Sequence, residues 1–487
     1  MPDNNACFIG IDVGTQGERV VLLDARGNLL GSAEEAFALN GQSREEQSPL
    51  AWWDACLRSL QQLLSQASRS IDLRHVRAIS VTSTSGTIIP IDHHHQPLHN
   101  AIMYSDTRQE QEGRACREAA LTHNPDGYTA FNTSSGLPKM MWFLHHYPDK
   151  APHIYKFIHA ADFITGRLSG RYDVTDLTNV LKSGYDVQQG QWPAYIWQQL
   201  PLQQQWLQRV IPSGTPVGNI DPALAAQLGL SEEVLIVAGM TDGCASQIAS
   251  GAVNPGDWNT TIGTTLVVKG VTTTAIHDPS GRLYNHRHPE GYWMPGGASN
   301  TGADWITRDF KEQLSALETQ AAAIIPTGHL SWPLMQQGER FPFIAPQARG
   351  FEDPGLTPAV RFAAGMEGVA YIERYAYTMI TQLSGEPVKA VYTAGGASNS
   401  PSWLRIRSNV LNLPLYKMKH ITGAVGAAIL AASKTSFTNI MEAAAAMTQV
   451  EKELHPDPAM AAAYNAHYFR FIQTLKQKGY IPEQIYA

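Results

Sequence analysis

The first part of the chain alternates between short apolar runs and one long amphipathic segment. We predict a strand over residues 7–12, CFIGID, which ends at a glycine turn, and two more strands over residues 18–37, joined at an Arg-Gly turn. Residues 48–68 begin with Ser-Pro and then repeat apolar side chains at helical spacing. Residues 76–81, VRAISV, return to strand. This order predicts the beginning of an α/β fold.

The second half of the chain repeats this beginning and then becomes rich in helices. Residues 257–270, DWNTTIGTTLVVKG, again give strand, Gly-Thr turn and strand. Residues 365–383 predict one amphipathic helix, and residues 387–396 predict a strand that runs into a glycine pair. Ser400 and Pro401 fit the N-cap and the first residue of another helix. Further helices are predicted over residues 423–433, 438–449 and 458–478.

The two similar beginnings divide the chain into two halves. We place the boundary near residues 252–256 and predict domains over residues 1–252 and 253–487. A chain of 487 residues is too long for one ordinary core, which agrees with this division. No low-complexity linker separates the halves, so we expect them to pack against each other with a central cleft between them.

Composition indicates a globular protein but decides little about its ligand. Hydrophobic residues make up 43% and charged residues 16% of the chain, and the net charge is −7. An acidic chain is a poor candidate for binding nucleic acid. A small anionic substrate stays compatible with this charge, because a local pocket can be basic in an acidic protein.

Cysteine usage and hydropathy indicate a cytoplasmic protein. The four cysteines are far apart and form no CxxC pair, which fits buried thiols in a reducing compartment. Residues 1–6 lack the basic start of a signal peptide, and the chain has no apolar run of 18 residues. We therefore expect no signal peptide and no membrane span.

Glycine turns after apolar runs are candidates for phosphate-binding loops. Consecutive amides in such turns form an anion-binding concavity, although each turn alone is more often plain turn chemistry. The chain has neither GxxxxGK[ST] nor a convincing GxGxxG that opens a helix, so a nucleotide site would be of another type. The turns are expected at Gly14, Gly263, Gly296–Gly297 and Gly395–Gly396, with Thr15 and Thr264 directly after two of them.

Two aspartates are candidates for the chemistry. Asp242 lies among Gly, Ala, Ser and Thr with no Lys or Arg nearby in sequence, and an unpaired buried carboxylate is costly. We interpret it as a base or orienting group. Asp12 ends the first strand, where a carboxylate could hold Mg²⁺ beside phosphates or cap the turn.

Other polar residues after strands admit two interpretations. Thr84, Ser85 and Gly86 follow residues 76–81 and could offer hydroxyls to a polyol. Asp106 lies two residues from Arg108, and a structural ion pair is the alternative to a binding role. His93-His94-His95 suggest a metal site, but three contiguous histidines cannot all face one ion, so we expect an exposed turn.

Taken together, these motifs resemble those of the FGGY family of carbohydrate kinases, within the actin-like (ribonuclease H-like) ATPase fold. The resemblance spans nearly the whole chain, and the order and spacing of its motifs make it specific. It rests on GIDVGTQGERVVLLD, EEQSPLAWWDA, MYSDTR, AGMTDGCASQIASGAV, TTIGTT, AGGASNSPSWLRIRSNVLNLPL and GAVGAAILAAS. It implies an α/β fold of two such ATPase domains, with the sugar and the first phosphate turn on the N-terminal side and the nucleotide on the C-terminal side.

The resemblance also implies a role for each matching residue. Asp242 matches the base that accepts the proton of the sugar hydroxyl, and Asp12 matches the carboxylate associated with Mg²⁺ and the phosphates. The phosphate turns match Gly14, Thr15, Gln16, Gly263 and Thr264, and the adenosine end matches Gly297, Gly395, Gly396 and Asn399 or Ser400. The sugar site matches Thr84, Ser85, Gly86 and Asp106, together with Asp242.

Two departures from the family pattern bear on the reaction and on the sugar. The residue after Gly14-Thr15 is commonly a small hydroxyl and is Gln16 here, whose amide can still donate to a γ-phosphate oxygen. Typical bacterial xylulose kinases carry Met-His at the positions of Ser85-Gly86. STSGTIIPID, TDLTNVLKSGYD and GGASNTG are more similar to the pentulose kinase branch that includes D-ribulose kinases.

The resemblance thus implies an ATP- and Mg²⁺-dependent kinase of D-xylulose or D-ribulose. The alternatives are another polyol, such as ribitol, L-ribulose or glycerol, or a non-catalytic sugar-sensing ATPase of the same fold. Relatives of this kind are often dimers, so a homodimer is an expectation by resemblance alone. The sequence leaves open which hydroxyl is phosphorylated.

Overall fold

The computed structural model describes residues 5–482 and divides the chain into two compact units. Unit 1 comprises residues 1–249, 286–291 and 420–448, and unit 2 comprises residues 250–285, 292–419 and 449–487. The division after Ala249 lies close to the predicted boundary. Neither unit is contiguous in sequence, because a late segment, residues 420–448, belongs to unit 1. The first four residues, on which the expectation of no signal peptide partly rests, lie outside the described part.

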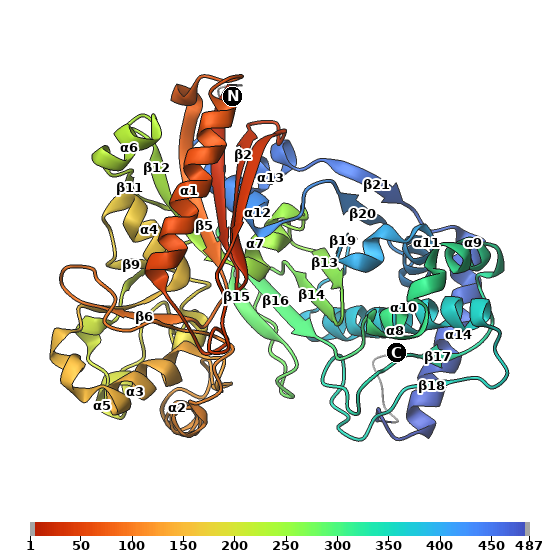
Figure 1. The fold of residues 1–487 in the computed structure, drawn as a ribbon. Coiled ribbons are helices and arrows are strands. Elements are labelled where there is room, and N and C mark those ends of the chain that lie inside the picture. Colours follow the sequence, from red (N-terminus) through yellow and green to blue (C-terminus); the bar gives the residue numbers. More distant parts are fainter. Residues whose placement is uncertain (1–4, 483–487) are drawn as a thin grey trace. The chain divides into compact units, whose positions relative to one another are not determined.

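Unit 1 is built on a six-stranded sheet with the order β11-β12-β5-β1-β2-β3 (Figure 1). β1 pairs with β2 and β2 with β3 in antiparallel fashion, whereas β1, β5 and β12 run parallel. The carboxyl ends of these three parallel strands therefore meet at one edge of the sheet. The strands are β1 (Cys7–Val13), β2 (Gly17–Asp24), β3 (Leu29–Ala36), β5 (Val76–Ser83), β11 (Pro216–Asn219) and β12 (Leu235–Thr241).

Helices cover this sheet, and the first of them begins as predicted. The Ser48 hydroxyl accepts the amide of Ala51 at the start of α1 (Pro49–Ala67). α12 (Gly423–Ser433) packs against β1, β5 and α7 (Asp242–Ala249). The approach of α12 to β1 is close because Gly10 has no side chain: a Cβ there would strike the Ala424 carbonyl. α4 (Ala160–Ser169) packs on β5 and β12, whereas α6 (Pro222–Leu228) packs on α1 and α13 (Ile440–Met447) on α12.

Unit 1 also carries two smaller sheets, whose strands lie between β5 and β11 in the chain except for β4, which precedes β5. One is four-stranded with the order β4-β7-β6-β8 and one pairs β9 with β10. α3 packs on β6, and its apolar face contributes to a separate hydrophobic cluster around Phe143. The elements are β4 (Glu46–Gln47), β6 (Ile88–Ile91), β7 (Ala101–Ile102), β8 (Lys156–His159), β9 (Val174–Asp176), β10 (Arg209–Ile211), α2 (Glu110–His123), α3 (Gly136–His146) and α5 (Tyr195–Gln198).

A seven-stranded sheet has the order β15-β16-β14-β13-β19-β20-β21 and belongs to unit 2, except for the last two residues of β15, which are assigned to unit 1. β13 and β14 form the predicted hairpin, and β13, β19 and β20 run parallel, so the ends of β13 and β19 share one edge. The strands are β13 (Asp257–Ile262), β14 (Leu266–Gly270), β15 (Tyr284–Arg287), β16 (Trp293–Ala298), β19 (Ala390–Ala394), β20 (Leu415–Met418) and β21 (Val450–Leu454). β17 (Ser331–Trp332) and β18 (Phe351–Glu352) form a separate pair.

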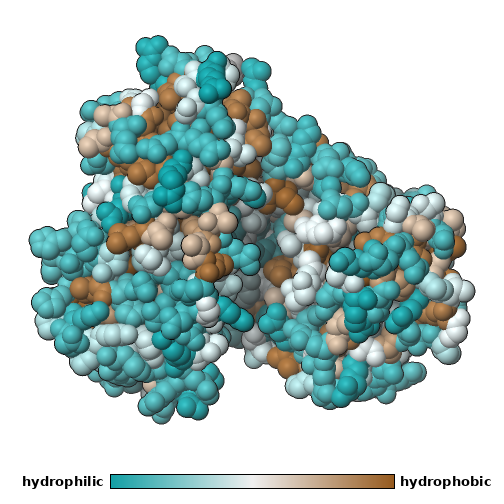
Figure 2. All heavy atoms as spheres, viewed as in Figure 1, coloured by the Kyte–Doolittle hydropathy of each residue, from teal (hydrophilic) through white to brown (hydrophobic). Residues whose placement is uncertain are grey.

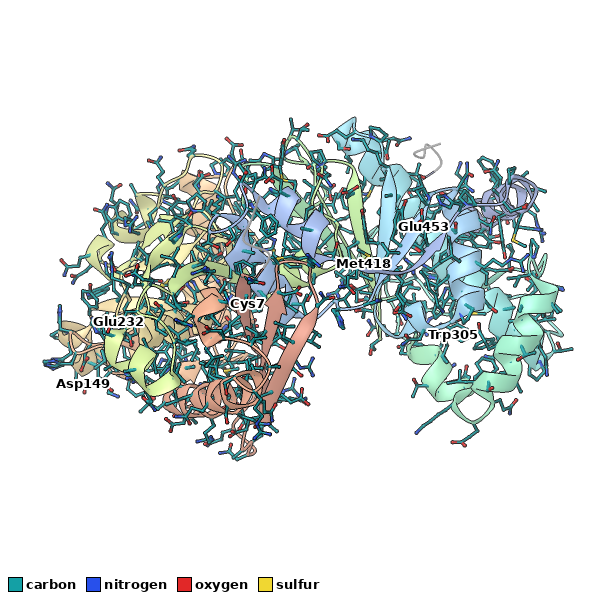
Figure 3. All side chains as sticks on the ribbon, turned by 90° about the horizontal axis from the view of Figure 1, so that it is seen from above. Cys7, Asp149, Glu232, Trp305, Met418 and Glu453 are labelled. Atoms are coloured by element: carbon teal, nitrogen blue, oxygen red, sulfur yellow. The ribbon has the colours of Figure 1, made fainter. Side chains whose placement is uncertain are left out.

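The helices of unit 2 agree with the predicted pattern. The amphipathic repeat of residues 365–383 lies within α10 (Pro358–Ser384), which is buried along most of its length. Ser400 caps α11 (Pro401–Leu411) by accepting the amide of Trp403. The core of the unit is aromatic and includes Trp305 (Figure 3), which stacks edge to face on Phe310. The other helices are α8 (Asp304–Asp309), α9 (Leu314–Ile324) and α14 (Pro458–Gln477).

The surface seen in Figure 2 is mostly hydrophilic on both units, with hydrophobic side chains scattered in small groups. All four cysteines are buried and none of them forms a disulfide, as expected; Cys7 lies on β1 (Figure 3). Among residues 5–482, none of the helices combines the length and the hydropathy that crossing a bilayer requires.

Candidate functional site

The carboxyl edge of the unit 1 sheet gathers three of the predicted motifs. In the strand register Thr82 of β5 lies between Asp12 of β1 and Met240 of β12. Asp12 is therefore followed by the glycine turn, Thr82 by Thr84–Gly86, and Met240 by Asp242, all at the same edge. Parallel pairing brings together residues that are far apart in sequence.

The glycine turn after Asp12 is a tight hairpin between β1 and β2. The Gly14 amide donates to the carbonyl of Gly17 at 2.9 Å, which closes the turn. The Thr15 carbonyl accepts from the Gln47 side chain at 3.0 Å, and the Gln16 carbonyl accepts from the Phe37 amide at 2.8 Å. The Gln16 side chain is exposed. The turn is thus fixed through its carbonyls.

Asp12 lies against the first residue of α12. A Cβ built on Gly423 would lie 2.5 Å from the Asp12 Oδ2. The helix begins there with the Thr422 hydroxyl as its cap, which accepts the Val425 amide at 3.4 Å. A helix N-terminus carries partial positive charge and favours anionic groups nearby, so α12 supports the carboxylate or an anion beside it.

Asp242 is the first residue of α7 and directly follows β12. Its side chain is half-buried, and its Oδ1 accepts the Gly243 amide at 2.6 Å. α7 in turn packs closely on α12, where a Cβ on Gly426 would strike the Ala245 carbonyl. Asp242 therefore lies at the start of a helix that packs on α12, the helix whose first residue lies against Asp12.

Asp12 and Asp242 are close enough for their charges to interact. Burial and, after it, the charge of Asp242 raise the pKa of Asp12 from 3.8 to about 7, and the positive charge of Arg19 opposes this. Two carboxylates that share a site disfavour each other's ionisation. A cation bound beside such a pair would offset this repulsion.

This donor set fits Mg²⁺ better than a metal held by the protein alone. Within residues 5–482 no cluster of three or more His, Cys, Asp or Glu side chains has the arrangement of a metal cage. Mg²⁺ is commonly held by one or two carboxylates together with substrate phosphates and water. The carboxylate of Asp12, next to a glycine turn and a helix N-terminus, matches that pattern.

Thr84, Ser85 and Gly86 form the loop after β5. Gly86 adopts φ +81° and lies against the Ser134 carbonyl, so any larger residue would be both strained and in collision. The Lys182 side chain passes beside it, with Cδ 3.6 Å from where a Cβ of Gly86 would lie. The half-buried Thr84 hydroxyl lies 3.4 Å from that of Thr87.

Asp106 forms the structural ion pair that was the alternative to a binding role. Its carboxylate is fully buried and accepts from the Arg108 guanidinium at 2.7 Å and from the Gln109 amide at 2.7 Å. These hydrogen bonds lower the pKa of Asp106 although burial acts in the opposite direction. A direct contact of Asp106 with substrate stays a prediction.

Lys139 is a charged residue of this region that the sequence analysis missed. It is fully buried on α3 and donates to the carbonyls of Thr133 and Ser135, which flank the residue that Gly86 touches. Burial lowers the pKa of Lys139 to about 7, Asp106 opposes the shift, and Lys182 adds to it. No periodicity distinguishes such a lysine from an exposed one.

Two of the glycine turns predicted in the second half lie together at one edge of the unit 2 sheet. Gly263 begins the β13–β14 turn, where Thr264 is exposed, and Gly395 follows β19 with φ +84°. A Cβ on Gly395 would strike the carbonyl of Ile262, directly before Gly263. Gly396 is exposed and has open space where a Cβ would lie.

The residues after these turns are polar and already partnered. The exposed Asn399 accepts from the Lys417 ammonium at 3.1 Å. Ser400 donates to the Glu318 carboxylate at 2.7 Å besides capping α11. Their predicted contacts with the nucleotide stay predictions.

The expectation of a glycine turn at Gly296–Gly297 is wrong. Both residues lie inside β16 and pair with β14. A Cβ on Gly297 would enter the ring of Phe341, so this glycine makes room for an aromatic side chain in the core. A glycine pair that follows an apolar run has the same sequence pattern whether it lies inside a strand or in a turn.

The histidine triplet is a turn, as expected. His93 and His94 are exposed, whereas His95 has φ 61° and stacks on Tyr172 with ring centroids 4.3 Å apart.

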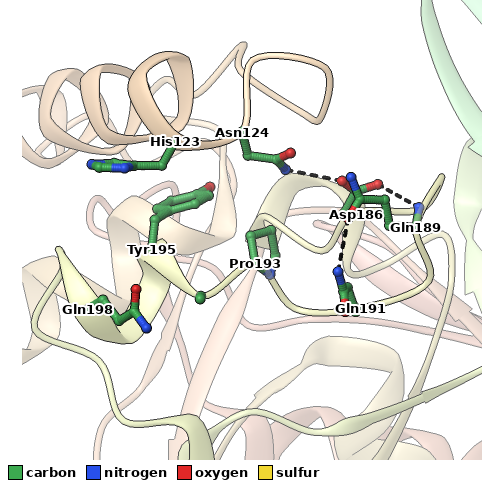
Figure 4. A pocket seen from close by; sticks show the side chains of 9 residues that line it. His123, Asn124, Asp186, Gln189, Gln191, Pro193, Tyr195 and Gln198 are labelled. Atoms are coloured by element: carbon green, nitrogen blue, oxygen red, sulfur yellow. Dashed lines mark hydrogen bonds between the residues drawn. The ribbon is translucent and has the colours of Figure 1, made fainter.

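A pocket elsewhere in unit 1 is lined by polar side chains and holds none of the predicted site residues (Figure 4). Its Asp186 accepts from Asn124 and from the Gln188 and Gln189 amides, which makes it a turn cap.

The two-unit α/β fold is that of the actin-like ATPases. Residues 7–249 match the N-terminal domain and residues 258–435 the C-terminal domain of the FGGY family of carbohydrate kinases. The chain therefore belongs to the FGGY family and is a carbohydrate kinase. The predicted α/β fold, family and enzyme class are confirmed.

Relatives agree with this assignment and differ in the substrate they are named for. The chain is 26% identical over 494 residues to a xylulose kinase of Staphylococcus epidermidis, with 96% of each chain covered. Its structure is similar to xylulose kinase from Rhodospirillum rubrum, with TM-score 0.84, 23% identity and 97% and 98% coverage. Gluconate kinase from Lactobacillus acidophilus gives TM-score 0.81, 21% identity and 97% and 98% coverage.

Proposed function

We propose that this protein transfers the γ-phosphate of ATP to a hydroxyl of a ketopentose, D-ribulose or D-xylulose, with Asp242 as base. The observation that carries the proposal is the Asp12–Asp242 pair at the carboxyl edge of the unit 1 sheet. One carboxylate is available for a metal and the other for a hydroxyl proton. The adjoining Thr84–Gly86 loop is the predicted sugar contact.

The roles around the pair follow from what each group can donate or accept. Asp12 would hold Mg²⁺, which supplies charge neutralisation at the phosphates when bound. The amides of the Gly14 turn and of the Gly263 and Gly395 turns would bind phosphate oxygens and the rest of ATP. We further propose a cytoplasmic location, because all four cysteines are buried and none of them forms a disulfide.

A carboxylate suffices as base for this reaction. Phosphoryl transfer passes through a loose transition state, so the acceptor hydroxyl must be aligned and gives up its proton late. General-base assistance contributes roughly 10²–10⁴-fold in rate. Asp242 acts as a base through its carboxylate, whose Oδ1 accepts a hydrogen bond from the Gly243 amide.

Two kinds of acceptor are compatible with the loop beside Gly86. Relatives named xylulose kinase and the pentulose-type motifs favour a neutral ketopentose. A relative named gluconokinase, from Bacillus licheniformis, is 24% identical over 431 residues, and Lys182 beside Gly86 would suit an acidic sugar. A sugar acid is therefore the second candidate.

The test is ADP release with each acceptor in parallel. D-ribulose and D-xylulose are compared with ribitol, L-ribulose, glycerol and gluconate at equal ATP and Mg²⁺. The proposal expects kcat/KM to be highest for one of the two D-ketopentoses. A higher value for gluconate would establish the second candidate, and ADP release without any acceptor dependence would contradict sugar phosphorylation itself.

A further inference from the structure

The strand that delivers Asp242 is irregular where it reaches the site. The pairing of β12 with β5 shifts register between Val237 and Met240. Gly239 fills this irregularity, and a Cβ there would strike the Val81 carbonyl. A strand that leaves its ladder loses hydrogen bonds that would hold its backbone, so something else must fix the residues before Asp242.

Two threonine hydroxyls hold the backbone at this point. The Thr82 hydroxyl donates to the Met240 carbonyl at 2.7 Å, and the Thr178 hydroxyl accepts the Thr241 amide at 2.8 Å. Thr241 is the residue before Asp242, and it is buried together with Thr82 and Thr178. The Met240 carbonyl and the Thr241 amide belong to the same peptide group, so the two hydroxyls hold this one peptide from both sides.

Thr178 is itself held by a buried carboxylate. Its hydroxyl donates to Asp176 Oδ1 at 2.6 Å while it accepts from Thr241, so both of its roles are defined. Asp176 also accepts from the Thr178 amide at 2.7 Å, from the Asn179 side chain at 2.5 Å and from the Ser213 hydroxyl at 3.3 Å. All these groups are at most 3% exposed. A hydroxyl that donates to a carboxylate becomes a better acceptor, because linked hydrogen bonds polarise one another.

We propose that Asp176 and Thr178 are positioning residues for Asp242: through the Thr241 amide they fix the backbone from which the base starts. This rests on the proposed function, in which Asp242 is the base. Neither residue is assigned a contact with sugar or ATP. Their action is to hold a peptide group, and through it a carboxylate, in place for the proton transfer.

Two substitutions of Thr178 distinguish a hydrogen-bonding role of its hydroxyl from a role in core packing alone. Thr178→Ser keeps the hydroxyl and loses only a methyl group. Thr178→Val keeps the shape, leaves the Thr241 amide without its acceptor and removes one of the donors to Asp176 Oδ1, which keeps the Thr178 amide and the Ser213 hydroxyl. A misplacement of about 1 Å can cost on the order of 100-fold in rate. We therefore expect the valine variant to lose turnover and the serine variant to keep it.

The first experiment measures kcat and KM by ADP release with the acceptor identified in the panel. Thr178→Val and Asp176→Asn are expected to lower kcat by about 10-fold or more with sugar KM changed less than about threefold. Thr178→Ser is expected to stay within about threefold of the wild type in kcat. Thr175→Val is the matched control: Thr175 is a buried threonine of β9 whose hydroxyl lies 3.3 Å from His159 Nδ1 instead of meeting Thr241. A kcat loss in Thr175→Val as large as that in Thr178→Val would overturn the proposal.

A double-mutant cycle with Asp242→Asn separates this proposal from the proposed function. If Thr178 acts through Asp242, Thr178→Val lowers kcat far less in the Asp242→Asn background than in the wild type. Equal losses in both backgrounds, with Asp242→Asn itself slow, would overturn the positioning role and leave Asp242 as base. Normal turnover of Asp242→Asn alone would instead overturn the base. Should Thr178→Val not fold, Asp176→Asn takes its place in the same cycle.

Discussion

Gly423 presses its backbone against Asp12, so that a methyl group on this glycine would lie 2.5 Å from the carboxylate. The two residues belong to opposite ends of the sequence and to the same unit. A side chain at the helix start would therefore collide with the carboxylate of Asp12. The absence of a side chain there is a requirement of the site as well as of packing.

Gly423→Ala should therefore reduce activity by displacing Asp12 or the first turn of α12. We expect kcat/KM for ATP to fall by about 10-fold or more, since displacements near 1 Å at a reacting group can cost on the order of 100-fold. Gly41→Ala is the control, because Gly41 is exposed and has no neighbour within 4 Å of a built Cβ. ADP release against ATP concentration measures both. Activity of Gly423→Ala within twofold of the control would contradict the assignment of Asp12.

Asp242→Asn should separate sugar binding from turnover. An amide is nearly isosteric and can still bond to a hydroxyl, so sugar affinity is expected within several-fold of the wild type. It cannot accept the proton, so turnover should fall by at least about 100-fold. Calorimetric titration with sugar and ADP release measure the two quantities.

The control for this variant is Asp149→Asn, because Asp149 is exposed on the surface of unit 1 (Figure 3). It should bind sugar and turn over like the wild type. Near-normal turnover of Asp242→Asn would remove Asp242 as the base, whatever its affinity for sugar.

Activity should depend on the ionisation of Asp12. Burial and the neighbouring Asp242 raise its pKa to about 7, so the carboxylate is mostly protonated below that pH and ionised above it. Only the ionised form binds a cation. We expect kcat/KM for ATP with Mg²⁺ to rise about tenfold per pH unit below pH 7 and then to level off. In Asp242→Asn one cause of the raised Asp12 pKa is absent, so the rise of kcat/KM with pH should occur at lower pH than in the wild type. If kcat/KM for ATP rises over the same pH range in both proteins, the charge interaction between the two carboxylates is contradicted.

Local sequence patterns predicted the strands, turns and helix starts that carry the residues of these predictions. Strand, glycine turn and strand occur at Gly14 and at Gly263 as expected, and the helices begin at Ser48 and Ser400 with the predicted caps. These features depend on residues that are neighbours in sequence. The same reasoning failed at Gly296–Gly297, because a glycine pair inside a strand and one in a turn differ only in what packs against them.

The contacts between residues of the site could not be predicted from the sequence, because they join residues that are far apart along the chain. Asp12 is juxtaposed to Gly423 by helix packing and to Asp242 by parallel strand pairing, and neither leaves a local pattern. The same holds for Thr178, whose hydroxyl meets a residue 63 positions further along the chain. Residue types indicated which carboxylates do chemistry, and tertiary packing decided what holds them.

Unit 2 contains a buried carboxyl group, that of Glu367, whose ionisation can be tested through protein stability without measuring catalysis. Glu367 of α10 is 1% exposed, and its carboxylate accepts from the Thr327 amide at 2.9 Å and hydroxyl at 2.5 Å and from the Tyr464 hydroxyl at 3.0 Å. Burial raises its pKa from 4.5 to about 7, and these hydrogen bonds oppose the shift only in part. The folded protein therefore holds this proton more tightly than the unfolded chain.

The sign of the pH dependence follows from that difference. A carboxyl whose folded pKa is raised stabilises the fold fully below its unfolded pKa, and this stability is lost as pH rises from about 4.5 through about 7. The shift corresponds to roughly 3 kcal/mol of unfolding free energy for this one group. Glu367→Gln cannot ionise and can still donate to the Thr327 hydroxyl, so it should lose less stability between pH 5 and pH 8 than the wild type. Urea unfolding at both pH values measures this, with the exposed Glu232→Gln as the matched control. An equal loss in Glu367→Gln, Glu232→Gln and the wild type would show that Glu367 is ionised in the folded protein throughout this range.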